Sequence, residues 1–179
     1  MVYIFLAQGF EEVEALAPLD LLRRAGVEIK TVGVGSRTVV GSHSIPVVAD
    51  MTDEEFSDDT PEMIILPGGM PGTLNLDASE VVHRAIDSAI SCKAHIAAIC
   101  AAPMILGKLG LLSGKEAICY PGFEEHLLGA KISEKTVAND GLFTTAKGMG
   151  AAIEFGLTLV ALLKGEETAE KLRASTISE

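Results

Sequence analysis

Short apolar runs alternate with stretches of helical periodicity along most of the chain. The apolar runs predict buried strands at residues 2–7, 27–35, 63–69 and 95–100. Amphipathic or apolar helices are predicted at 11–26, 79–93, 150–165 and 166–175, with another starting directly after residue 100. Strands that alternate with helices in this way predict an α/β fold, with a mostly parallel sheet covered by helices on both faces.

The remaining segments predict smaller elements. Residues 38–50 suggest a hairpin, and the acidic stretch 51–62 a surface connection. Short strands are expected within 116–132 and 135–148, the second with a turn at Asn139-Asp140-Gly141. The sequence contains no repeat, linker or low-complexity tract, so we expect one domain over residues 1–179.

Three candidate features follow predicted strands, where the ligand crevice of such a fold lies. They are an acidic triplet after residue 9, the turn Pro67-Gly68-Gly69, and Cys100. Cys100 stands between small residues, with almost no loop before the next helix. That pattern is typical of a nucleophile elbow, and the amino end of the following helix is expected to lower the thiol pKa. A small buried core cysteine is the alternative, and it is the role expected for Cys92 and Cys119.

Glu14 differs in helical phase from Glu11 and Glu12, which suit a helix N-terminus without further function. Its carboxyl group can lean toward the carboxyl edge of the sheet. Burial beside a thiolate would favour its protonated form, which could donate to sulfur and act as a general acid and base. One N–H of the glycine turn and that of Ala101 could form an oxyanion hole, although a plain strand-to-helix turn explains the glycines equally well.

Composition limits the function further. With 14 Lys and Arg against 25 Asp and Glu, the net charge is −11, which argues against nucleic acid as a stable partner. No apolar run is long enough for a membrane span, and the N-terminus lacks a basic leader. Three cysteines form no disulfide framework, and neither they nor the histidines show metal-ligand spacing. We therefore expect a cytoplasmic protein without metal, P-loop or dinucleotide cofactor.

None of the four histidines lies at a predicted strand end, so a Cys-His-Asp triad is not supported. His126 follows the segment "YPGFEE" and could approach the site. A glutamine amidotransferase would need a late His-Glu pair, but Glu154 has no histidine closely before it. That class is disfavoured.

The stretches "GFEEVEALAPLDLLRRAG", "ILPGGMPG", "AAICAAP" and "DGLFTTAKGMGAAIEFGL" together resemble the ThiJ/PfpI superfamily, specifically its DJ-one branch. The resemblance covers nearly the whole chain. It implies a flavodoxin-like three-layer sandwich of the class I glutamine amidotransferase-like type, forming a two-fold homodimer. It also implies Cys100 as reactive cysteine and Glu14 as its protonated partner, with oxyanion donors at the backbone of Gly69 and Ala101.

We expect Gly68, Tyr120, His126 and Lys147 as further pocket residues, Lys147 because relatives often carry a basic residue at this position near the pocket. The resemblance also suggests that Arg24 and His43 lie near the dimer interface. It implies a cofactor-independent glyoxalase or deglycase that acts on dicarbonyls such as methylglyoxal or on their adducts. Many relatives carry histidine where this chain has Tyr120, a poor base near pH 7. The protease-like branch has histidine after the cysteine, whereas this chain has Ala101, so proteolysis is disfavoured. The alternative is a redox sensor or stress chaperone in which Cys100 oxidises to sulfinate.

Overall fold

A seven-stranded sheet forms the centre of the computed structural model, which describes residues 1–57 and 60–178. The strand order is β10-β11-β7-β6-β1-β2-β5. All neighbours are parallel except β10 and β11, which form an antiparallel hairpin, so the predicted mostly parallel sheet is confirmed. The strands are β1 (Val2–Leu6), β2 (Ile29–Gly33), β5 (Met51–Thr52), β6 (Met63–Leu66), β7 (His95–Ile99), β10 (Val137–Asp140) and β11 (Phe143–Ala146).

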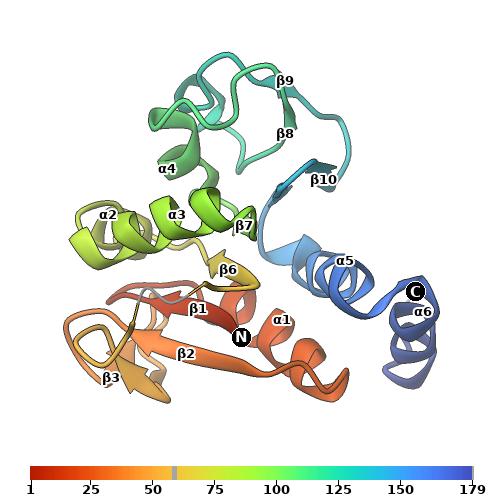
Figure 1. The fold of residues 1–179 in the computed structure, drawn as a ribbon, viewed down its shortest axis with the longest axis horizontal. Helices are drawn as coiled ribbons and strands as arrows, with labels where there is room; N and C mark the ends of the chain where they lie inside the picture. The colour runs from red at the N-terminus through yellow and green to blue at the C-terminus, as the bar shows by residue number, and fades with distance from the viewer. Residues whose placement is uncertain (58–59, 179) are drawn as a thin grey trace.

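Helices cover both faces of this sheet (Figure 1). Alternation along β1 explains the two cores, because Ile4 and Leu6 pack toward one layer and Phe5 toward the other. The first layer contains α1 (Glu12–Arg24), α5 (Ala152–Lys164) and α6 (Glu166–Ser175). The second contains α2 (Gly72–Asp77), α3 (Glu80–Cys92) and α4 (Pro103–Lys108). The predicted three-layer α/β sandwich is confirmed.

Helix α1 is held closely against α5. A Cβ atom on Gly156 would lie 2.7 Å from Leu21 Cδ1 and 2.9 Å from Pro18 Cα, so only glycine permits this crossing. At the other end of α1, the Glu11 side chain caps the helix by accepting a hydrogen bond from the Glu14 N–H at 2.7 Å. The helix that carries Glu14 is therefore fixed at its start and along its packed face.

Smaller elements surround the sheet edges. The predicted hairpin is formed by β3 (Thr38–Val40) and β4 (Pro46–Val48), and β8 (Glu116–Ala117) pairs with β9 (Lys131–Ile132). Two 3₁₀ turns complete the chain, η1 (Glu124–His126) and η2 (Met149–Ala151). In the described residues no helix is both long and apolar enough to cross a membrane.

The structure corrects three details of the sequence interpretation. Helix α2 was not predicted, because six residues beginning with glycine show no clear period. The acidic stretch 51–62 is not only a connection, since β5 pairs with β2 at the sheet edge; its residues 58–59 lie outside the described residues. Cys119 is buried as expected, but Cys92 is exposed at the end of α3, so its predicted packing role is wrong.

Candidate active site

Cys100 occupies an abrupt turn between β7 and α4. Its backbone φ angle of 65° is a left-handed conformation that is uncommon for residues other than glycine. Two main-chain hydrogen bonds hold it there: the Cys100 N–H donates to Ala146 O at 2.9 Å, and the Cys100 carbonyl accepts from the Tyr120 N–H at 2.8 Å. The strained backbone is thus tied to β11 on one side and to the segment after β8 on the other.

The sulfur of Cys100 accepts hydrogen bonds from the backbone N–H groups of Gly69 and Ala101. Burial nevertheless raises the pKa of the thiol to about 12, and the charge of Glu14 adds to the rise. The expectation of a lowered thiol pKa is therefore wrong. The two N–H donors favour the thiolate, but they do not offset desolvation and an adjacent carboxylate.

Glu14 lies beneath this turn and is 1% exposed. Its Oε2 accepts from the Gly68 N–H at 3.1 Å, and its carboxyl group also hydrogen-bonds the Met149 N–H and the Cys100 side chain. Burial raises the pKa of Glu14 to about 7, with a further contribution from the negative charge of Glu11. A carboxyl group in this position keeps its proton close to neutral pH.

Gly68 makes the contact between these two side chains possible. A Cβ atom there would lie 2.5 Å from Glu14 Oε2 and 2.6 Å from the Cβ of Cys100. No side chain fits, so the turn that follows β6 must have glycine at position 68 for the carboxyl and thiol groups to meet.

Glu14 and Cys100 act as one titrating pair. The ionised form of each disfavours ionisation of the other, so the pair loses its first proton at about pH 7 and holds a single negative charge between about pH 7 and about pH 12. The shared proton can reside on sulfur or on the carboxyl oxygen. When it resides on oxygen, Glu14 donates to a thiolate that the Gly69 and Ala101 N–H groups also stabilise.

A pocket of about 570 Å³ opens where the segments after β8 and β11 approach each other. Tyr120 and Lys147 line it, together with Pro121, Thr136 and the run from Gly148 to Ala151. Gly148 links the pocket to the buried pair, since a Cβ there would lie 3.3 Å from the Tyr120 ring and 3.9 Å from Glu14 Oε1.

Residues 1–162 match the sequence profile of the DJ-1/PfpI family. The chain belongs to the DJ-1/PfpI family. Protein dj-1beta of Drosophila melanogaster is 34% identical over 172 residues, which cover 94% of this chain and 92% of that protein. Its crystal structure superposes with a TM-score of 0.94, covering 99% of this chain and 97% of the other.

Two further relatives bear on chemistry. The Caenorhabditis elegans protein named glutathione-independent glyoxalase DJR-1.2 is 28% identical over 164 residues, covering 90% of this chain and 87% of that protein. A Toxoplasma gondii DJ-1 structure, described as oxidized, has a TM-score of 0.94 and 32% identity, covering 98% of this chain and 97% of that one. The DJ-1/PfpI family therefore includes a named glyoxalase and a member solved in an oxidised form.

His126, an expected pocket residue, and the two residues expected near the dimer interface lie elsewhere in the structure. His126 ends η1, where its ring packs 6.1 Å from Phe123 and its backbone lies against Gly107 of α4. Among the described residues, His126 forms no main-chain hydrogen bond with Cys100 and does not line the pocket. Arg24 pairs with Asp20 at the end of α1, a full helix length from His43.

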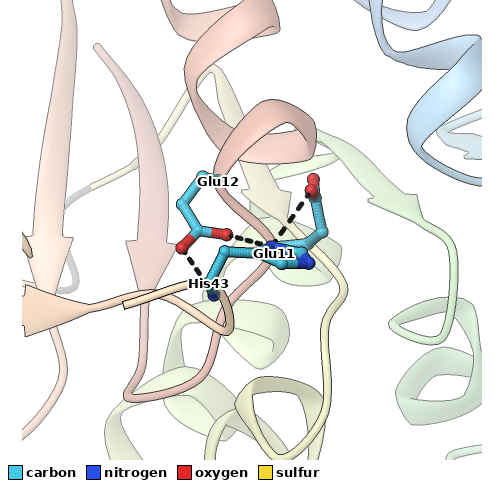
Figure 2. A group of neighbouring side chains, drawn as sticks. All are labelled: Glu11, Glu12 and His43. Carbon is cyan, nitrogen blue, oxygen red and sulfur yellow. Dashed lines mark hydrogen bonds and ion pairs between the residues drawn. The ribbon is translucent and has the colours of Figure 1, made fainter. Parts of the chain in front are cut away.

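His43 instead closes a cluster at the start of α1 (Figure 2). Glu12 accepts hydrogen bonds from the His43 N–H at 2.8 Å and Nδ1 at 2.9 Å, and Glu11 lies 3.9 Å from Nδ1. Burial raises the pKa of Glu12, but its hydrogen bonds, led by that of His43, hold it below its usual value. One carboxylate oxygen each of Glu11 and Glu12 and a ring nitrogen of His43, atoms of the kind that bind metal ions, lie within 4.8 Å of one another. Because both Glu12 oxygens already accept from the hairpin, the cluster joins β3–β4 to α1.

One contributor to the site was missed by the sequence interpretation. Met149 donates its backbone N–H to Glu14, and no side-chain pattern reveals a main-chain donor. The neighbouring glycines of "GMGAA" were the available signal, because they let the chain pass close to a ligand or a buried group.

Proposed function

We propose that this DJ-1/PfpI protein is a cysteine-dependent glyoxalase that converts α-oxoaldehydes such as methylglyoxal to α-hydroxy acids. The hydrogen-bonded pair of Glu14 and Cys100, facing two backbone N–H donors, carries the proposal. The same chemistry on the adduct of a dicarbonyl with an amine or thiol would be a deglycase activity. The named glyoxalase among the relatives supports this choice.

In the first step, the Cys100 thiolate attacks the aldehyde carbon. A carbon–sulfur bond forms, and the carbonyl electron pair moves to oxygen. The N–H groups of Gly69 and Ala101, which already face the sulfur, are close enough to stabilise this oxyanion. Protonated Glu14 then supplies the proton that makes it a hemithioacetal.

In the second step, the ionised Glu14 removes the proton from the former aldehyde carbon. An enediol forms, and reprotonation at the neighbouring carbon leaves an α-hydroxy thioester. Water hydrolyses this thioester, which releases the hydroxy acid and restores the thiol and the carboxyl group. Oxidation of one carbon balances reduction of the other, so the sequence requires no redox cofactor or metal.

The test is metal-free lactate production from methylglyoxal by the wild type and by Cys100→Ser. We expect turnover by the wild type and a loss of at least about a hundredfold in the variant. Cys92→Ser removes an exposed thiol outside the site and serves as the matched control. Equal rates for the wild type and Cys100→Ser would contradict the proposal.

A redox role is the second candidate, favoured by the oxidised structure of the Toxoplasma gondii relative. The groups that stabilise a thiolate at Cys100 would also stabilise a sulfinate: two backbone N–H donors and a protonated Glu14. Mass spectrometry after mild peroxide treatment tests this role. Cys100 should gain two oxygens before the exposed Cys92 does; preferential oxidation of Cys92 would contradict the role.

We also propose that the protein forms a homodimer through the apolar outer side of α1 and α5. Val13 is 43% exposed on α1, and Ile153 is 43% exposed at the start of α5. A second copy covering these side chains would explain their exposure. Sedimentation equilibrium should give twice the chain mass for the wild type and a lower mass for Ile153→Glu.

The domain and compartment assignments are proposals as well. Helix α6 extends beyond the matched residues 1–162 but packs on α5, which supports one domain over residues 1–179. Cys92, Cys100 and Cys119 are free, in keeping with a reducing compartment such as the cytoplasm.

A further inference from the structure

The pocket between the segments after β8 and β11 contains one charged side chain, that of Lys147. Its lining residue Tyr120 is joined to Cys100 by a main-chain hydrogen bond of 2.8 Å. Its other lining residues are apolar, glycine, Tyr120 or Thr136. Among residues 1–57 and 60–178, no acidic side chain lies within ion-pair distance of the Lys147 ammonium group. In a chain of net charge −11, this makes a local positive site within a negative surface.

The sheet register brings Lys147 close to Cys100. Ile99 at the end of β7 pairs with Ala146 at the end of β11, so the residues that follow both leave the same sheet edge. The Cys100 N–H donates to Ala146 O at 2.9 Å, which fixes the two chain segments together. The Lys147 N–H donates to Thr136 O at 2.9 Å, so its backbone is anchored while its side chain is exposed.

The size of the pocket argues for a substrate larger than methylglyoxal. A volume of about 570 Å³ is within the range of small-molecule sites. A three-carbon dicarbonyl bound at sulfur would leave much of the apolar wall and Lys147 without a contact. A longer chain could span the wall and place a negative end at the ammonium group.

We propose that Lys147 binds the anionic end of α-oxoaldehyde substrates that carry a terminal carboxylate, while their aldehyde carbon is held at Cys100. This substrate class rests on the proposed glyoxalase function. A representative is 4,5-dioxopentanoate, in which two methylene groups separate the dicarbonyl from the carboxylate. Addition of water with the internal hydrogen shift described above gives 2-hydroxypentanedioate, and the carboxylate at Lys147 takes no part in bond making.

The first test does not depend on turnover. Iodoacetate and iodoacetamide alkylate thiolates by the same displacement of iodide, but only iodoacetate carries a negative charge. The ratio of their rates at Cys100, followed by mass spectrometry, cancels any change in the thiolate fraction. We expect Lys147→Met to lower the ratio of iodoacetate to iodoacetamide about fivefold, the size expected for one screened charge nearby. Lys147→Glu should lower it further.

Lys164→Met is the matched control, because it removes the same charge at the far end of α5. Its ratio should equal that of the wild type, and added salt should reduce the wild-type ratio. Equal ratios for Lys147→Met and Lys164→Met would overturn the assignment of Lys147.

The second test compares kcat/KM for 4,5-dioxopentanoate and methylglyoxal. We expect the wild type to prefer the anionic substrate and Lys147→Met to lose most of that preference. Turnover of methylglyoxal with no preference that depends on Lys147 would overturn this inference and leave the glyoxalase function standing. Absence of turnover with both substrates would refute the glyoxalase function, and the alkylation ratios would still decide whether Lys147 attracts anions to Cys100.

Discussion

The buried carboxyl group of Glu14 hydrogen-bonds the side chain of Cys100 directly beneath Gly68. One residue comes from the first helix, and the other follows directly after β7, the fifth strand of the main sheet in chain order. Once the pair has lost its first proton, at a pKa of about 7, the two groups together carry one negative charge, which gives the site a nucleophile and a proton donor at once.

This relationship predicts how the rate depends on pH. The reactive form has lost one proton from the pair, so kcat/KM for methylglyoxal should rise as pH increases through the Glu14 pKa of about 7. In Glu14→Gln this rise should disappear, because the carboxyl group is gone and burial, the largest cause of the raised thiol pKa, remains. We also expect a loss of about a hundredfold or more at pH 8. Glu28→Gln changes an exposed carboxyl group and should keep the wild-type profile; an unchanged profile in Glu14→Gln would contradict the assigned role.

Replacement of Tyr120 by histidine is expected to increase the glyoxalase activity. A phenol with a pKa near 10 is a poor proton acceptor at pH 7, whereas an imidazole titrates near 6.5. Tyr120→His should therefore raise kcat for methylglyoxal and add an ionisation near pH 6.5. Tyr120→Phe keeps an aromatic ring against Gly148 without any base, so it should show no gain. Similar kcat values for the His and Phe variants would show that proton transfer does not use this position.

The close packing at Gly68 predicts that a larger side chain there lowers stability. The Cβ of Gly68→Ala would overlap Glu14 Oε2 and Cys100, and both are packed in place. We expect about 1–3 kcal/mol of destabilisation in urea unfolding. At Gly150 a Cβ meets nothing within 4 Å, so Gly150→Ala provides the matched control and should unfold like the wild type. Equal stability of the two variants would mean that the turn can relax around a side chain.

The hydrogen bonds between His43 and Glu12 predict that the β3–β4 hairpin is held against α1 in a pH-dependent way. The hydrogen bond to Glu12 raises the pKa of His43. The stability that this hydrogen bond gives the hairpin is fully present below the unfolded-state histidine pKa of about 6.5. It is lost as pH rises through the higher pKa that His43 has in the folded protein. Amide exchange in the hairpin, corrected for intrinsic rates, should accelerate across that range. His43→Ala should exchange quickly throughout, and the control His83→Ala should behave as wild type, because His83 bonds Asp77 on the other face.

The sequence predicted the structure best where the pattern of apolar and polar residues extends over a long segment. The sheet, the two helical layers and the turn at Cys100 followed from periodicity and from small residues beside the cysteine. Helix α2 and strand β5 were missed, because six- and two-residue elements carry too short a pattern. The rise of the thiol pKa was also missed, since it depends on burial and on a carboxyl group 86 positions away in sequence, from Cys100 back to Glu14.

The position of Tyr120 at the pocket allows the site to be followed by intrinsic tyrosine fluorescence. The chain has no tryptophan and two tyrosines, and Tyr3 packs edge-on against Phe56, away from the pocket. Tyr120 is 51% exposed beside the turn that holds Cys100. Intrinsic emission excited in the tyrosine band therefore carries a signal from the pocket without any attached dye. Alkylation or oxidation at the sulfur could be followed continuously in the unlabelled protein, with Tyr120→Phe supplying the blank.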